Sequence, residues 1–141
     1  MSIVVESLTK VYGVQKALDE ISFNAESGVL GFLGPNGAGK STTMKILTGF
    51  IPQTSGKASV CGFDVGTQAI EVKRRIGDLP ESNALYMDMY VKESLGFMAG
   101  IHQMRSPQKR IAEIIEQTGL GPEQHKKVGQ LSKGYKQRVG L

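Results

Sequence analysis

The feature that most constrains this sequence is a glycine-rich segment, Gly34-Pro35-Asn36-Gly37-Ala38-Gly39-Lys40-Ser41. It fits the pattern G-x-x-x-x-G-K-[ST] at every fixed position. An apolar run, Val29–Leu33, precedes the segment, and a helical pattern over Ser41–Thr48 follows it. A chance glycine-rich turn would not be expected to stand between a strand and a helix. The context therefore predicts a P-loop, a backbone cradle for phosphate groups.

The residue types in this segment suit the chemistry of a triphosphate. Glycines let the backbone curl so that successive N–H groups point at phosphate oxygens, and the following helix directs its positive end at the same anion. Lys40 is predicted to bring an ammonium group to the β- and γ-phosphates, and the Ser41 hydroxyl to bind Mg²⁺. Lys40 is accordingly one of two predicted catalytic residues.

Strands and helices alternate on both sides of the predicted P-loop. Besides Val29–Leu33, short β-branched or alternating runs predict strands at Ile3–Leu8, Leu18–Asn24, Ala58–Cys61 and Ile76–Leu79, and a helix is predicted at Thr67–Arg75. The fold class is therefore α/β: a P-loop core with a mainly parallel sheet and an antiparallel strand region at the N-terminus. We predict that residues 1–86 form this core.

Residues 87–141 are predicted to form a helical subdomain. One helix covers Lys92–Met104; a second begins at Ser106-Pro107, with the serine as its cap, and ends at Gly119. Met87, Met89, Met98 and Met104 gather in this region. Filling of a core is the favoured interpretation, and a methionine-rich groove for a partner is the alternative.

Charge and composition argue against a nucleic-acid partner. Residues 1–120 hold 12 Lys+Arg and 12 Asp+Glu, so the net charge of +4 comes entirely from residues 121–141. The sequence has no Trp and no interleaving of aromatic and basic residues of the kind that binds RNA. A single cysteine, Cys61, excludes an internal disulfide and a cysteine zinc site.

Two segments together resemble the ATPases of ABC transporters. The P-loop has the form GPNGAGKST, which extends to Thr42, and Leu131-Ser132-Lys133-Gly134-Tyr135 resembles the LSGGQ signature of that family. Lys133 and Tyr135 depart from its commonest version. The resemblance implies that residues 34–42 bind ATP and that Ser132, Gly134 and the following helix contact the γ-phosphate of ATP held by a second subunit.

Two further site residues follow from the same resemblance. Tyr12, just after the first strand, matches the aromatic residue that stacks on adenine. Glu81 occupies the Q-loop position, where most members have glutamine; its carboxylate is predicted to reach Mg²⁺ or the attacking water, and the alternative is an exposed loop acid. Glu81 after Leu79-Pro80 resembles the branch with gliding-motility, sodium-efflux and multidrug exporters.

Several motifs of the family are not found in these residues. The only apolar run into an aspartate is Ala84–Asp88, which precedes the signature and is followed by Met89 rather than glutamate, so it is not a Walker B motif. The chain is therefore expected to be a partial domain, unable to hydrolyse ATP. The segment before the P-loop, Gly28–Gly31, is one residue shorter than the corresponding run of the family it resembles. A one-residue slip reverses the faces of a strand, so the pairing of this strand is the part of the predicted sheet that the sequence leaves open.

The resemblance implies the ATP-binding subunit of a transporter, lying in the cytoplasm on the inner face of the cell membrane. ATP and Mg²⁺ are the implied cofactors, and a transmembrane permease and a second ATP-binding subunit the implied partners. The alternatives are a non-transport ABC protein and a module that only binds nucleotide. A GTPase is disfavoured because no Asn-Lys-x-Asp segment is present.

Overall fold

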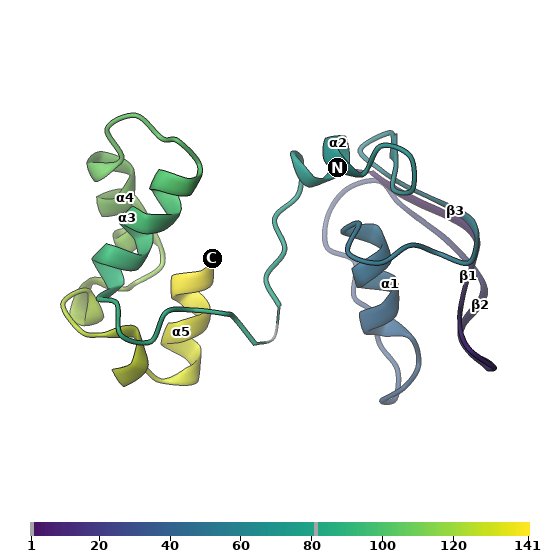
Figure 1. Cartoon of the computed structure of the whole chain (residues 1–141), viewed down its shortest axis with the longest axis horizontal. Coiled ribbons are helices and arrows are strands. Elements are labelled where there is room, and N and C mark those ends of the chain that lie inside the picture. The colour runs from purple at the N-terminus through teal and green to yellow at the C-terminus, as the bar shows by residue number, and fades with distance from the viewer. Residues whose placement is uncertain (1, 81) are drawn as a thin grey trace. The chain divides into compact units, whose positions relative to one another are not determined.

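The computed structural model describes residues 2–80 and 82–141 and divides into two compact units (Figure 1). Unit 1 spans Met1–Asp78 and unit 2 spans Leu79–Leu141. The boundary predicted from the sequence, after residue 86, therefore lies inside unit 2. Among the described residues, no helix is long and apolar enough to cross a membrane.

Unit 1 is built on a four-stranded sheet with the order β2-β1-β3-β4. Its strands are β1 (Ile3–Tyr12), β2 (Gln15–Ala25), β3 (Ser55–Val60) and β4 (Phe63–Asp64). β1 pairs with both β2 and β3, and each pair in the described residues is antiparallel. The antiparallel N-terminal region is therefore observed, whereas the parallel part of the predicted sheet is not.

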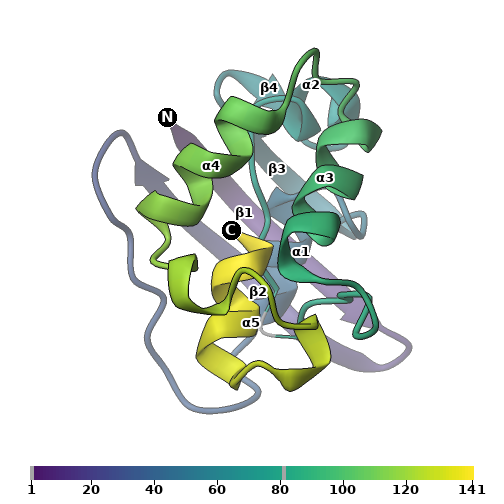
Figure 2. The ribbon, with the colours of Figure 1, turned by 90° about the vertical axis from the view of Figure 1, so that its left-hand side faces the viewer.

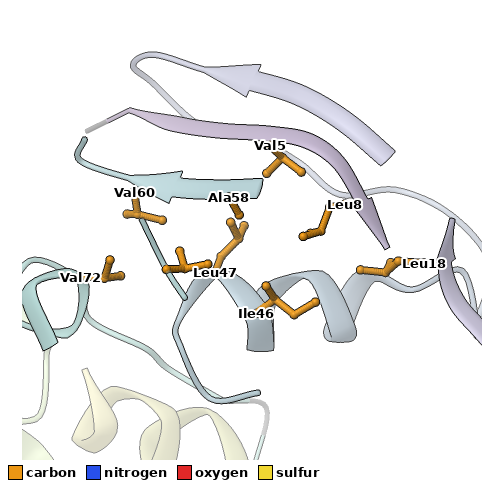
Figure 3. Packing of buried hydrophobic residues seen from close by; sticks show 9 residues of the cluster. Val5, Leu8, Leu18, Ile46, Leu47, Ala58, Val60 and Val72 are labelled. Carbon is orange, nitrogen blue, oxygen red and sulfur yellow. The ribbon is translucent and has the colours of Figure 1, made fainter. Parts of the chain in front are cut away.

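Helix α1 (Lys40–Leu47) packs on this sheet through its apolar side (Figure 3). Ile46 and Leu47 are buried, because the sheet supplies a facing layer of buried aliphatic side chains: Val5, Leu8, Leu18, Ala58 and Val60. The helix ends at Gly49, whose φ of 67° lets its N–H bond the carbonyl oxygen of Ile46 at 2.9 Å. The predicted helix end at Gly49 is confirmed.

The predicted strand at Val29–Leu33 does not form. Val29 and Leu33 are 102% and 95% exposed, and the segment has no strand partner in the described residues. Phe32 makes an edge-to-face contact with Phe23 of β2, at 5.2 Å between ring centroids. A strand is stabilised by pairing, so this apolar run stays irregular. The strand predicted at Ile76–Leu79 is absent for the same reason.

Helix α2 (Ala69–Lys73) follows a polar turn that is centred on Asp64. The Asp64 carboxylate accepts hydrogen bonds from the Thr67 backbone N–H at 2.8 Å and from the Thr67 hydroxyl at 2.9 Å. These bonds hold the pKa of Asp64 below its ordinary value, because they favour the charged carboxylate. The helix is shorter than the predicted Thr67–Arg75 because this turn uses its first residues.

Unit 2 is helical, as predicted, with α3 (Val91–Ile101), α4 (Gln108–Gln117) and α5 (Lys133–Gly140) (Figure 2). Two short 3-10 turns, Gly121–Glu123 and Val128–Gln130, connect α4 to α5. The core joins residues from α3, α4, α5 and these connections: Val91, Ile115, Leu120, Val128, Leu131 and Val139. The start of α5 is fixed by this core, because Leu131 lies just before the helix and Val139 within it.

Two expectations for unit 2 are wrong and one is confirmed. Ser106 does not cap α4; it has a φ of 52°, and Pro107 is the capping residue. Gly119 ends the helix, since its N–H bonds the Glu116 carbonyl oxygen at 3.1 Å. The methionines do not fill the core: Met87, Met98 and Met104 are each more than 40% exposed, and Met89 is only partly buried.

Candidate nucleotide site

The glycine-rich loop between Phe32 and α1 takes a conformation that other residues rarely adopt. Gly34, Gly37 and Gly39 have φ values of 150°, 86° and 85°. The Ala38 N–H closes a turn on the carbonyl oxygen of Pro35 at 3.3 Å. Glycine has no Cβ and enters the positive-φ region at little cost, so the three predicted glycines stand where the backbone requires them. Nearly the whole loop is exposed.

Gly39 is the point at which the loop meets the sheet. A Cβ at this position would lie 2.5 Å from Leu18 Cδ2 and 2.7 Å from the carbonyl oxygen of Ala17, both on β2. On the other side, the carbonyl oxygen of Gly39 accepts hydrogen bonds from the N–H and the hydroxyl of Thr43, at 2.9 and 3.0 Å. The end of the loop is thus held between β2 and the first turn of α1.

Lys40, the first residue of α1, folds its side chain back over the loop. Its ammonium donates hydrogen bonds to the carbonyl oxygens of Gly34 and Pro35, both at 2.7 Å. The N–H groups of the first turn have no acceptors within the helix, and that turn contains no acidic residue. A positive charge and N–H donors without acceptors in the helix therefore lie at the start of the same helix, an arrangement that suits a phosphate group.

Ser41 and Thr42 continue this first turn. Ser41 is exposed and Thr42 is partly buried, while Thr43 is buried and bonded to Gly39. Ser41 is therefore an exposed hydroxyl residue next to Lys40 in the first turn of α1. No group of three or more His, Cys, Asp or Glu side chains that could hold a metal gathers anywhere in the residues described.

Tyr12 lies at the end of β1, with 49% of its surface exposed. It pairs across the hairpin with Gln15, and Ala17, whose carbonyl approaches Gly39, is two residues further along β2. Two strand residues span about 7 Å. The backbone of Tyr12 is therefore near the part of β2 that Gly39 contacts, within unit 1.

Lys10 was missed by the sequence analysis. Its ammonium lies 5.1 Å from the centroid of the Tyr12 ring and donates a hydrogen bond to the carbonyl oxygen of Pro52 at 2.6 Å. The only available signal was a basic residue two positions before Tyr12. A lysine on a surface strand is too common for that to stand out.

The signature segment in unit 2 forms the start of α5. Ser132 is the N-cap, and its Oγ accepts a hydrogen bond from the Tyr135 N–H at 3.4 Å. Ser132, Lys133 and Gly134 are exposed, and the first turn holds no acidic residue. Arg138 of α5 donates a hydrogen bond to the carbonyl oxygen of Thr118, at the end of α4, at 3.2 Å. This helix start has the same donor character as that of α1.

The structure brings together the predicted site residues of unit 1: Tyr12, residues 34–39, Lys40, Ser41 and Thr42. Ser132 and Gly134 lie together at the start of α5 in unit 2. Glu81, the second predicted catalytic and metal-binding residue, lies outside the described residues.

A glycine-rich loop that leads into a helix, with a lysine held over the loop, defines a P-loop nucleotide-binding protein. The profile of the ABC transporter family matches residues 18–141, and the chain belongs to that family. The region that matches contains both the P-loop and the signature segment.

Relatives with assigned names agree with this membership. The bacitracin transport ATP-binding protein BcrA of Bacillus licheniformis is 40% identical over 147 residues, which cover 100% of this chain and 47% of BcrA. The linearmycin resistance ATP-binding protein LnrL of Bacillus subtilis (strain 168) is 35% identical over 139 residues, 96% of this chain and 45% of LnrL. The chain thus spans about half the length of these bacterial relatives.

A solved structure shares the fold. It is described as the ATP binding subunit of an ABC transporter and matches with a TM-score of 0.77 at 25% identity. The match covers 99% of this chain and 60% of that one. The mixed α/β architecture described above is therefore that of an ABC ATP-binding subunit, over the part that this chain contains.

The contact between Gly39 and β2 can be tested with a matched pair of alanine variants. Gly37 and Gly39 have nearly equal φ values, but a Cβ at Gly37 would meet nothing within 4 Å. Both variants carry the positive-φ cost of about 1–2 kcal/mol. We expect Gly39→Ala to lose about 1–3 kcal/mol more, because the methyl group overlaps Leu18 and Ala17. Chemical denaturation without nucleotide measures both, and equal losses would contradict the close contact.

Proposed function

We propose that this chain is the nucleotide-binding part of a transporter ATPase, with ATP and Mg²⁺ as its ligands. The observation that carries the proposal is the Lys40 ammonium, held over the P-loop at the start of α1 by two carbonyl oxygens at 2.7 Å. The names of two relatives, the bacitracin transport ATP-binding protein BcrA and the linearmycin resistance ATP-binding protein LnrL, support the proposal.

Triphosphate binding would proceed by an exchange of partners at Lys40. Phosphate oxygens replace the carbonyl oxygens of Gly34 and Pro35 as acceptors, and charge-assisted bonds of this kind are stronger than those to neutral carbonyls. The N–H groups of residues 40–42, which have no acceptor within the helix, add further donors. Tyr12 offers an exposed ring to the base from the neighbouring hairpin.

The residues present suit a magnesium ion that is bound mainly by the nucleotide. Mg²⁺ keeps several waters and is held by one or two protein oxygens together with substrate phosphates. Ser41 supplies one such oxygen beside the loop, and Glu81 is proposed as a second ligand. When bound, the ion would supply positive charge that offsets the charge developing on the phosphate during transfer.

A second copy is proposed to complete the site through its signature segment. Ser132 and Gly134 stand exposed at the start of α5, without an acidic residue in that turn. This helix end attracts an anion and would contact the γ-phosphate of ATP bound to the partner. Water attack on that phosphate would then require both copies.

The proposed membrane partner is a permease subunit, which would hold this chain at the cytoplasmic face of the membrane. Unit 2 offers exposed apolar side chains for such a contact. Tyr86 and Phe97 are 57% and 40% exposed and pack edge to face at 5.4 Å between centroids. Met98 and Ile101 extend this surface along α3. The exposed methionines favour the partner-surface alternative over core filling.

The first test concerns Lys40. We expect Lys40→Ala to weaken ATP binding about 10–100-fold, because a charge-assisted contact contributes about 1.5–3 kcal/mol. Lys45→Ala is the matched control, since Lys45 is exposed in the last turn of the same helix and its loss removes the same charge. Calorimetric titration with ATP measures both. Equal affinities for wild type and Lys40→Ala would exclude the P-loop site.

The second test concerns the base. Stacking on Tyr12 does not depend on hydrogen bonds to the base edge, and every base has a π-face. We expect ATP and GTP to differ in affinity by less than about tenfold, or 1.4 kcal/mol. Competition binding with the two nucleotides measures this ratio. A preference for GTP by several orders of magnitude would contradict stacking as the mode of base recognition.

The third test concerns hydrolysis by residues 1–141 alone. In-line attack needs a group that orients water and a further carboxylate for Mg²⁺, and the sequence offers no Walker B segment for either. We expect phosphate release no faster than that of Lys40→Ala, with intact BcrA assayed alongside as a positive control. Lys40-dependent turnover comparable to BcrA would show that other residues of this chain perform catalysis.

A further inference from the structure

The ammonium of Lys10, which lies over the Tyr12 ring, has two partners. It is 5.1 Å from the ring centroid, within the range of a cation–π contact, and it donates a hydrogen bond to the Pro52 carbonyl oxygen at 2.6 Å. The side chain of Lys10 is partly buried rather than extended into solvent. An ammonium with two partners loses freedom that a surface lysine normally keeps, so this position is specific.

The carbonyl that holds Lys10 is itself anchored to β1. The Thr54 N–H donates to the carbonyl oxygen of Thr9 at 2.9 Å, and the Val11 N–H donates to the Thr54 hydroxyl at 3.0 Å. These two bonds fasten the loop that contains Pro52 along the end of the strand. Lys10 therefore connects two fixed elements, the loop and the aromatic ring.

An ammonium on one face of an aromatic ring leaves the opposite face for a second partner. Tyr12 is at the end of its strand and half exposed, so its ring would otherwise be free to change rotamer. A ring that is already oriented loses less conformational entropy when a base stacks on it, and affinity rises by that difference. The cation thus acts on nucleotide binding through the ring and not by contact with the nucleotide.

We propose that Lys10 is a positioning residue for base recognition. Its ammonium, held by the Pro52 carbonyl oxygen, orients the Tyr12 ring so that the opposite face of the ring is presented to the base. This inference rests on the proposed role of Tyr12 in adenine stacking. A competing explanation is that Lys10 only adds positive charge near the triphosphate. The two differ in whether Tyr12 and the base are needed for its effect.

A double-mutant cycle separates the two explanations. We expect Lys10→Met to weaken ATP binding about two- to five-fold, the factor that corresponds to an exposed cation–π contact. In the Tyr12→Ala background the same change should have no effect. Lys10→Arg should retain the affinity of wild type, because a guanidinium can make both contacts. Inorganic tripolyphosphate, which has no base, should bind Lys10→Met and wild type equally.

Two further variants complete the design. Lys10→Gln keeps a donor for Pro52 but carries no charge, so it should lose affinity as Lys10→Met does, and it serves if that variant is unstable. Lys57→Met removes an exposed charge from β3 of the same sheet and should change nothing. Thermal unfolding of each variant without nucleotide confirms that all of them are folded.

Each contrary result has a distinct meaning. If Tyr12→Ala weakens ATP binding and Lys10→Met does not, the positioning role is overturned and the stacking role stands. If Lys10→Met weakens tripolyphosphate binding as well, or acts equally without Tyr12, its effect is that of charge and the inference is overturned. If Tyr12→Ala leaves ATP affinity unchanged, the stacking role itself fails, whereas the Lys40 test still decides the P-loop.

Discussion

The close approach of Gly39 to β2 is the contact on which the site of unit 1 depends. The loop before Gly39 is mostly exposed and carries one internal turn, so it has little to hold it in place. At Gly39 the backbone lies against Ala17 and Leu18, and there the chain enters α1, whose Ile46 and Leu47 are buried on the sheet. The position of the Lys40 ammonium follows from that junction. Because Ala17 is also two residues from Gln15, the partner of Tyr12, this contact lies near both the proposed phosphate site and the proposed base site.

Local features of the sequence predicted local structure well. The P-loop glycines, the helix after them and the helix ends at Gly49 and Gly119 depend on φ preferences and on hydrogen bonds over four or five residues, which a short window contains. The strand at Val29–Leu33 failed because a strand requires a partner from elsewhere in the chain. An apolar run indicates that burial of its side chains is favourable, but it does not indicate which part of the chain would bury them.

The errors in unit 2 have the same origin. The Ser106-Pro107 pair is a sound helix start by composition, yet the connection from α3 brings Ser106 in at positive φ, where it cannot cap. The methionines were assigned to the core by type alone, and residue type does not say which positions the packing of unit 2 covers. Lys10 could not be found in advance because its role lies in a contact with a loop some forty residues away.

The two helix starts that are proposed to meet phosphate break the same electrostatic rule. α1 begins with Lys40 and α5 with Lys133, and neither has an acidic residue in its first turn. A lysine at the positive end of a helix is unfavourable by a few tenths of a kcal/mol or more, and acidic residues are the usual choice there. Helix α3 follows the usual rule, with Glu93 in its first turn. Departures from local preference are expected where function requires them, and an anion at the start of α1 would be attracted by both the Lys40 ammonium and the helix end. Helix α4 also lacks an acidic residue in its first turn, so charge alone does not distinguish the two starts. The glycine-rich loop before α1 and the Ser132 cap of α5 are what set these two apart.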